Sequence, residues 1–111
     1  MILADTSVWV EHFRHGSPRL RELLEAGEVV MHPMILGELA CGNLAHRAET
    51  LHRLAHLPAV AQLPDSVVLE AIEVRRLWAK GIGWIDAHLL AASLVSGTHL
   101  WTLDQRLAKL K

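Results

Sequence analysis

Four acidic residues occupy positions where a lone carboxylate is costly. Asp5 and Asp104 each follow a short strand-like run, Glu38 lies inside an apolar segment, and Asp86 opens another. No Lys or Arg is close in sequence to Glu38, and burying a carboxylate is unfavourable unless it is paired or bound to a metal. Four carboxylates that converge without a counter-charge repel one another, and a hard divalent cation would hold them together. Ligation by oxygen alone favours Mg²⁺, with Mn²⁺ as a substitute, over Zn²⁺.

Each acid taken singly has a simpler explanation. Asp5, Asp86 and Asp104 all stand where a helix is predicted to begin, and Asp is among the most favourable N-caps. Glu38 could face solvent. What indicates a metal site is the set, because two acids at strand ends join two acids in apolar helices with no cation placed nearby in sequence to neutralise them.

The acids can meet only if an α/β fold brings them together. Short apolar runs without polar alternation are typical of strands covered on both faces, and here they alternate with helical segments, as in a parallel sheet. The predicted strands are Ile2–Ala4, Val29–Met31, His99–Thr102 and, as a shorter candidate between two prolines, Ala59–Ala61. Asp5 and Asp104 then fall at the carboxyl edge of the sheet, where crevices form. We expect one three-layer domain over residues 1–111, with a central parallel sheet of about four strands flanked by helices.

Helical periodicity and capping residues predict the remaining elements. The predicted helices are Val8–Phe13 with Thr6 or Ser7 as cap, Pro18–Ala26, Pro33–Gly42, Asn43–Leu57, a helix capped by Asp65 or Ser66 and running to Lys80, Ala87–Val95, and a last helix from Gln105. The Pro33 helix is apolar on every side and is therefore expected to be buried. In the helix that ends at Lys80, Val67, Ala71, Val74 and Trp78 are expected to face inward.

Composition narrows the possible functions. A hydrophobic content of 51% excludes a disordered chain, and 11 Lys and Arg against 12 Asp and Glu leave bulk charge that neither favours nor excludes a nucleic acid. The single cysteine, Cys41, excludes an intramolecular disulfide and a cysteine zinc site, so we expect a cytoplasmic protein. Asp5 interrupts any signal-peptide core, and no apolar stretch approaches the roughly 18 to 20 residues that a membrane span needs.

The histidines and tryptophans do not define a site by themselves. Asp86 and His88 are two residues apart, which places them on nearly opposite sides of a helix and makes them poor co-ligands. His46, His52 and His56 match no zinc pattern and are interpreted as surface residues. Trp9, Trp78 and Trp101 are expected on inner faces, whereas Trp84, in a glycine loop beside Asp86, remains open as a base-stacking residue. The basic clusters near both termini and mid-chain are interpreted as ordinary solvated charge.

The order and spacing of these motifs resemble the PIN-domain ribonucleases, and more narrowly the VapC-type toxins of bacterial toxin–antitoxin pairs. The motifs are Asp5-Thr6-Ser7, Gly37-Glu38-Leu39, Gly83-Trp84-Ile85-Asp86-Ala87-His88-Leu89-Leu90-Ala91 and Leu100-Trp101-Thr102-Leu103-Asp104. The resemblance implies that Asp5, Glu38, Asp86 and Asp104 are the catalytic metal ligands, with Thr6, Ser7 and Thr102 as possible supporting hydroxyls. Family members usually continue into a final edge strand, so for a chain that stops at Lys111 we expect either a sheet one strand short or a sequence trimmed at its C-terminus.

The same resemblance implies a function and partners. We expect an endoribonuclease that hydrolyses phosphodiesters of RNA, a structured RNA such as tRNA being the expected substrate, with Mg²⁺ polarising the phosphodiester and activating a water molecule. A homodimer and a cognate antitoxin are also implied. The antitoxin would lay an amphipathic helix over an apolar groove and place an Arg near the acids.

Two alternatives remain at this point. A phosphoaspartate phosphatase could use Asp5 as its nucleophile, but such a site generally needs a second acid two residues on, where Ser7 stands, and a reachable lysine. A non-catalytic module could bind a metal or a basic partner through the same acids. The sequence leaves open which RNA is cut, how many metal ions bind, and which antitoxin pairs with the chain.

Overall fold

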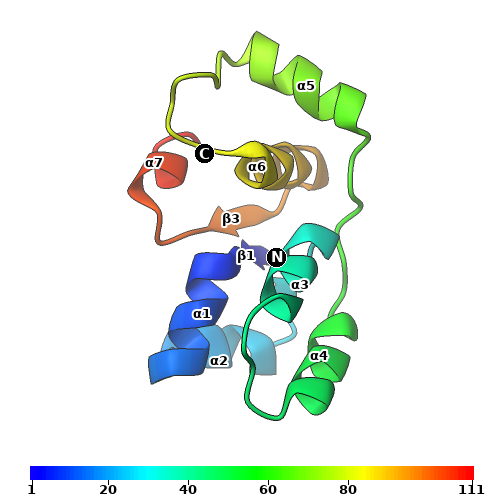
Figure 1. Ribbon diagram of the computed structural model, residues 1–111, viewed down its shortest axis with the longest axis vertical. Helices are drawn as coiled ribbons and strands as arrows, with labels where there is room; N and C mark the ends of the chain where they lie inside the picture. Colours follow the sequence, from blue (N-terminus) through cyan, green and yellow to red (C-terminus); the bar gives the residue numbers. More distant parts are fainter.

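A parallel sheet of three strands forms the centre of the computed structural model, which describes residues 1–111. Strand β1 (Ile2–Ala4) lies between β2 (Val29–Val30) and β3 (His99–Trp101), so the first and last strands of the chain are neighbours (Figure 1). Ile2 is in register with Val29 on one side and His99 on the other. Both predicted outer strands and the parallel arrangement are therefore confirmed.

The expected fourth strand is reduced to a single bridge. Met31 pairs in parallel with Ala59, the Met31 amide donates to the Pro58 carbonyl at 2.7 Å, and the Val60 amide donates to the Met31 carbonyl at 2.8 Å. Pairing goes no further because Pro58 has no amide hydrogen and the segment is only a few residues long. The prediction of about four strands was therefore too high by one.

Helices cover both faces of the sheet and produce three layers. In Figure 1, α6 and α7 lie on one side of the sheet with α5 outside α6, and α1 to α4 lie on the other side. Their bounds are α1 Thr6–His15, α2 Pro18–Glu25, α3 Pro33–Ala40, α4 Arg47–Ala55, α5 Asp65–Val74, α6 Trp84–Ser96 and α7 Gln105–Ala108. None of these helices has both the length and the apolar character that crossing a membrane requires.

Side-chain caps set where several helices begin. Ser17 and Pro18 start α2 as predicted, with the Ser17 hydroxyl accepting from the Leu20 amide at 3.2 Å. Helix α1 is capped by Asp5 instead of Thr6 or Ser7, because the Asp5 carboxylate accepts from the Val8 amide at 3.2 Å. Asp104 caps α7 in the same way. The capping explanation of these two acids is thus correct, and it leaves oxygen atoms available for other contacts.

Helices α4 and α5 are shorter in the structure than the sequence predicted. Helix α4 begins at Arg47 instead of Asn43, because His46 has a φ of 48°, a left-handed conformation that a helix does not continue through. Helix α5 ends at Val74, before the left-handed residues Arg76 and Ala79. A loop therefore replaces the last turns of the helix that was expected to reach Lys80.

The inner face of α5 differs from the prediction. Val68 has no solvent exposure, whereas Val67, Val74 and Trp78 are 42%, 75% and 52% exposed. The apolar residues of this segment fit two neighbouring helical stripes, and the packing of Val68 against Ala87 and Ala91 of α6 selects the other one. The expectation that Trp78 faces inward was wrong.

Helix α3 is buried on one face only. Ile35 and Leu39 belong to the main core, while Gly37 and Glu38 are exposed. The expectation of a helix buried on every side was therefore wrong, and solvent reaches Glu38. Trp9 is buried at 2% exposure as predicted, and Trp101 is partly buried against the core.

Two histidines lie inside the molecule with no solvent exposure. His32 caps α3 by accepting from the Met34 amide through Nδ1 at 3.0 Å, so its proton is on Nε2, which has no partner. Burial, and secondarily the neighbouring His88, lower the pKa of His32 below its ordinary value of 6.5. The folded protein therefore holds His32 neutral at pH values where an unfolded chain would protonate it.

The free energy of unfolding is expected to fall as the pH drops below about 6.5, because unfolded His32 binds a proton that folded His32 does not. His32→Asn, which keeps an acceptor for the Met34 amide, should flatten this dependence relative to wild type. Chemical denaturation between about pH 7.5 and about pH 5 measures the effect. His56→Asn, at an exposed position, is the control. An unchanged pH dependence in His32→Asn would contradict the assignment.

Candidate functional site

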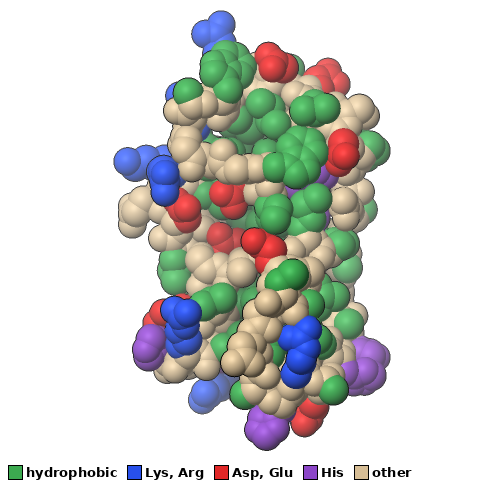
Figure 2. Space-filling view, in the orientation of Figure 1, with side chains coloured by type: hydrophobic (Ala, Val, Ile, Leu, Met, Phe, Trp, Pro, Cys, Tyr) green, Lys and Arg blue, Asp and Glu red, His purple; other side chains and the backbone are tan.

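The four acids predicted from the sequence converge at the carboxyl edge of the sheet. Asp5 follows β1 directly, Asp104 lies shortly after β3, Glu38 is on α3, and Asp86 is the third residue of α6. Partial burial raises the pKa of Asp86, and the negative charges of Asp104, Asp5 and Glu38 raise it further. A hydrogen bond from the Gly83 amide, at 3.5 Å, opposes this shift. Figure 2 shows acidic side chains gathered near the middle of this face.

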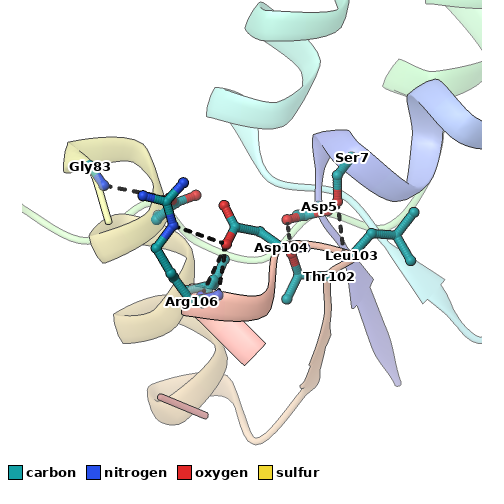
Figure 3. Close-up of polar contacts among 9 residues, drawn as sticks. Asp5, Ser7, Gly83, Thr102, Leu103, Asp104 and Arg106 are labelled. Atoms are coloured by element: carbon teal, nitrogen blue, oxygen red, sulfur yellow. Dashed lines mark hydrogen bonds and ion pairs between the residues drawn. The ribbon is translucent and has the colours of Figure 1, made fainter. Parts of the chain in front are cut away.

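Asp5 is held by two hydroxyl groups, one on each carboxylate oxygen. The Ser7 hydroxyl donates to Oδ1 and the Thr102 hydroxyl donates to Oδ2 (Figure 3). Each hydroxyl also accepts from a backbone amide at 3.0 Å, Ser7 from Leu103 and Thr102 from Asp104. Asp5 is only 5% exposed, so these contacts replace the hydration that burial removes. They also fix the end of β1 against the turn that carries Asp104.

Glu38 and Asp104 are oriented by donors of their own. The Thr6 hydroxyl donates to Glu38 Oε1 at 2.7 Å. Asp104 Oδ1 accepts from the Arg106 amide at 2.8 Å and lies 3.9 Å from the Arg106 guanidinium. Each of the three hydroxyls predicted as supports therefore contacts an acid. The Thr102 hydroxyl bonds to the Asp5 carboxylate, but of Asp104 it contacts only the backbone amide.

The chemistry of this group fits a hard divalent cation. Its donors are carboxylate oxygens, which Mg²⁺ and Mn²⁺ prefer, and no histidine or thiol stands among them. No three acidic, histidine or cysteine side chains are drawn together closely enough to form a ligand cluster. A cation at this edge would offset the repulsion that raises the pKa of Asp86.

The histidines stay outside the acidic group. His88 points into the core and its Nε2 lies 3.2 Å from Asp65 Oδ1, so the expectation that it is a poor partner for Asp86 agrees with the structure. His46, His52 and His56 are exposed, as expected. No sequence pattern marked the contact between His88 and Asp65, because the two residues are 23 positions apart and belong to different helices.

Arg106 is the neighbour of the acids that the sequence did not single out. Its side chain passes so close to Gly81 that a Cβ there would lie 2.6 Å from Arg106 Cδ. Gly81 also has a φ of 80°, which an L side chain rarely adopts. Gly81 therefore lets the arginine lie against the loop before α6 while it contacts Asp104. From the sequence, Arg106 was grouped with the basic cluster near the end of the chain and interpreted as ordinary solvated charge.

Comparison with known proteins places this arrangement among related sequences and folds. The PIN domain family profile matches residues 2–111. Ribonuclease VapC32 of Mycobacterium tuberculosis, in strains CDC 1551 / Oshkosh and ATCC 25618 / H37Rv, is 45% identical over 108 residues, covering 96% of this chain and 87% of the relative. The crystal structure of PAE2754 from Pyrobaculum aerophilum matches with a TM-score of 0.70 and 16% identity over 99% of this chain and 84% of that one. The predicted α/β fold with a parallel sheet between helices is confirmed.

Replacing Thr102 by Val should lower the free energy of unfolding by about 1 to 3 kcal/mol, because Asp5 Oδ2 loses its donor and the Asp104 amide loses its acceptor. Thr102→Ser keeps both contacts and is the matched control. Urea denaturation of the two variants and the wild type measures the difference. Equal stability of Thr102→Val and wild type would show that the hydroxyl does not hold the acid.

In chelator at neutral pH, Asp86→Asn should be more stable than wild type. The raised pKa of Asp86 means that its charged form is disfavoured in the fold, so its cost to stability is absent well below pH 3.8 and grows as pH rises through the folded pKa. Asparagine removes the charge and keeps an acceptor for the Gly83 amide. Glu22→Gln, on the exposed surface of α2, serves as control. A less stable Asp86→Asn protein in chelator would contradict the electrostatic account.

Proposed function

The chain belongs to the PIN domain family, and on that premise we propose that it is a divalent-metal-dependent endoribonuclease of the VapC type, the toxin of a toxin–antitoxin pair. A relative 45% identical over nearly the full chain is named as a ribonuclease, which supports RNA as the substrate. The observation that carries the proposal is the gathering of four acids from separate elements at the carboxyl edge of the sheet, where hydroxyl and backbone donors orient them. One domain over residues 1–111 is proposed to carry the activity in the cytoplasm.

The proposed metal ligands and catalytic residues are Asp5, Glu38, Asp86 and Asp104. When bound, Mg²⁺, or Mn²⁺ in its place, supplies a Lewis acid that polarises the phosphodiester and activates a water molecule. The hydroxyls of Thr6, Ser7 and Thr102 orient two of these carboxylates before substrate arrives. Such preorganised groups need not rearrange during the reaction.

Arg106 is suited to meet the phosphate backbone beside the acids. The Arg106 side chain is 69% exposed, and its guanidinium lies beside Asp104. Because a polyanion is repelled by uncompensated carboxylates, a fixed cation here would help to hold the phosphate that flanks the cleaved bond. A structured RNA such as tRNA is the proposed substrate.

The proposed antitoxin would occupy the face formed by α1, α2 and α4. An apolar cavity of about 350 Å³ lies there, lined by Trp9, Phe13 and Leu54 among others. Phe13 also lines a neighbouring cavity of about 200 Å³ that reaches Glu38. A bound amphipathic helix could therefore lie along apolar side chains and bring an arginine towards the acids. A homodimer is proposed with it, on the likeness to VapC-type toxins.

Of the two alternatives, the phosphoaspartate enzyme has less support from the site. Ser7 stands two residues after Asp5 and donates to its carboxylate, and the Thr102 hydroxyl occupies the other oxygen. A non-catalytic module would bind metal through the same acids without cutting RNA. Metal binding with no cleavage of any RNA would favour that module.

Purified protein should cleave structured RNA in Mg²⁺ or Mn²⁺ and not in chelator. Asp5→Asn and Asp86→Asn should each lower the cleavage rate by more than about 100-fold, since losing even a partner of a metal ligand costs about 10- to 100-fold. A gel assay on tRNA measures the rates, and circular dichroism verifies folding. Glu22→Gln should cleave at the wild-type rate. Wild-type cleavage by folded Asp86→Asn would overturn the assignment.

A further inference from the structure

A small apolar pocket lies beside the acidic group, between α5 and the start of α6. Its volume is about 170 Å³, well below the range of pockets for drug-sized ligands, so it suits one flat ring. Two tryptophans, Trp78 and Trp84, contribute to its lining together with aliphatic side chains and the backbone at Gly83. Figure 2 shows hydrophobic side chains gathered on this face directly above the acidic ones.

The two tryptophans of this pocket are exposed to solvent, unlike Trp9 in the core. Trp78 is 52% exposed and Trp84 is 40% exposed, while Trp9 in the core is 2% exposed. Trp84 is held in place by an edge-to-face contact with the buried ring of His88, with ring centroids 4.6 Å apart and planes at 88°. An indole fixed at one edge and open to solvent is a preformed stacking surface.

Unpaired positive charges lie close in sequence to the residues that line this pocket. The loop between α5 and α6 carries Arg75, Arg76 and Lys80, all exposed. None of them is among the four ion pairs of the chain, which involve Glu11, Glu49, Asp65 and Asp104 with other partners. Exposed aromatic rings interleaved with free cations are the arrangement by which proteins hold single-stranded nucleic acid.

Two contacts connect this loop to the acids. The Gly83 amide, in the pocket wall, donates to Asp86 at 3.5 Å. Arg106 lies against Gly81 of the loop and contacts Asp104 (Figure 3). The loop that forms one wall of the pocket is therefore joined to two of the acids by direct contacts.

We propose that this pocket receives an unpaired base of the RNA substrate, stacked on Trp84, next to the phosphate that is cleaved. The inference rests on the proposed function and deepens it by naming the substrate class. Trp84 and Asp86 are two residues apart on α6 and face different sides, so the stacked base belongs to a nucleotide flanking the cleaved bond. Paired bases are not available for such stacking, which assigns the cut to a loop, bulge or single-stranded end.

The test combines a variant with a substrate change. The probe is a hairpin RNA that wild type cleaves in its loop in Mg²⁺, made also with single abasic nucleotides on either side of the cut. Trp84→Ala should lower kcat/KM about 5- to 150-fold, the range that corresponds to losing one stacked base, and Trp84→Phe should restore most of it. Val95→Ala, an exposed apolar position further along α6, is the matched control.

Coupling between the two changes decides the outcome. An abasic nucleotide at one flanking position should reduce wild-type cleavage by a similar factor and have no further effect on Trp84→Ala, because both changes remove the same contact. Fully additive losses, or Trp84→Ala cleaving like wild type, would overturn the proposal. The proposal would also fail if Trp84→Ala lost cleavage activity together with self-association in gel filtration, since a second copy of the chain would then cover the pocket. If wild type cleaves no RNA, the proposed ribonuclease function itself fails. If wild type cleaves RNA but Trp84→Ala behaves like it, only the base pocket fails.

Discussion

Repulsion among four carboxylates at one edge of the sheet is the constraint on which the rest of this structure depends. Asp5, Glu38, Asp86 and Asp104 come from four separate parts of the fold, and partial burial, followed by the charges of the other three acids, disfavours the ionised form of Asp86. The fold resists that repulsion by giving each acid donors of its own, chiefly hydroxyls and backbone amides. Such a site stores unfavourable electrostatic energy in the folded protein, which a cation releases on binding.

The donors that restrain the acids also join the two ends of the chain. Strand β1 pairs with β3 across nearly the full length of the sequence, and Ser7 and Thr102 extend this contact beyond the last backbone pair. A residue that positions a carboxylate of the candidate site is therefore also a residue that stabilises the sheet edge. Asp5 and Asp104 can be helix caps and candidate site residues at once because the helix amides bond to only one of the two oxygens of each carboxylate.

The sequence was sufficient for the three strands, the framed helix α2 and the position of Asp5 and Asp104 after neighbouring strands, because these depend on local signals: apolar runs, caps and strand ends. It was insufficient where two local solutions have nearly equal energy. Residues 65–78 fit a helix with either of two apolar stripes, and only packing of Val68 against α6 decides between them. The start of α4 depends on the left-handed conformation of His46, which no residue pattern marks, and Ala59 forms a strand-like pair only because Met31 lies beside it. The contact of His88 with Asp65 likewise has no local signal.

The exposure of Trp78, which the sequence pattern had placed inside, bears on how an acidic site can hold RNA. With a formal net charge of −1, the chain cannot rely on overall attraction for a polyanion, and its carboxylates repel phosphates locally. Turning Val68 inward leaves Trp78 outside, near Trp84 and the free cations of the following loop. Stacking on an indole does not depend on charge, so it supplies binding energy that neither salt nor the nearby acids weaken. In this arrangement Trp84 contributes to RNA binding and Asp86 to cleavage from neighbouring positions on α6, and only cleavage needs the divalent metal ion.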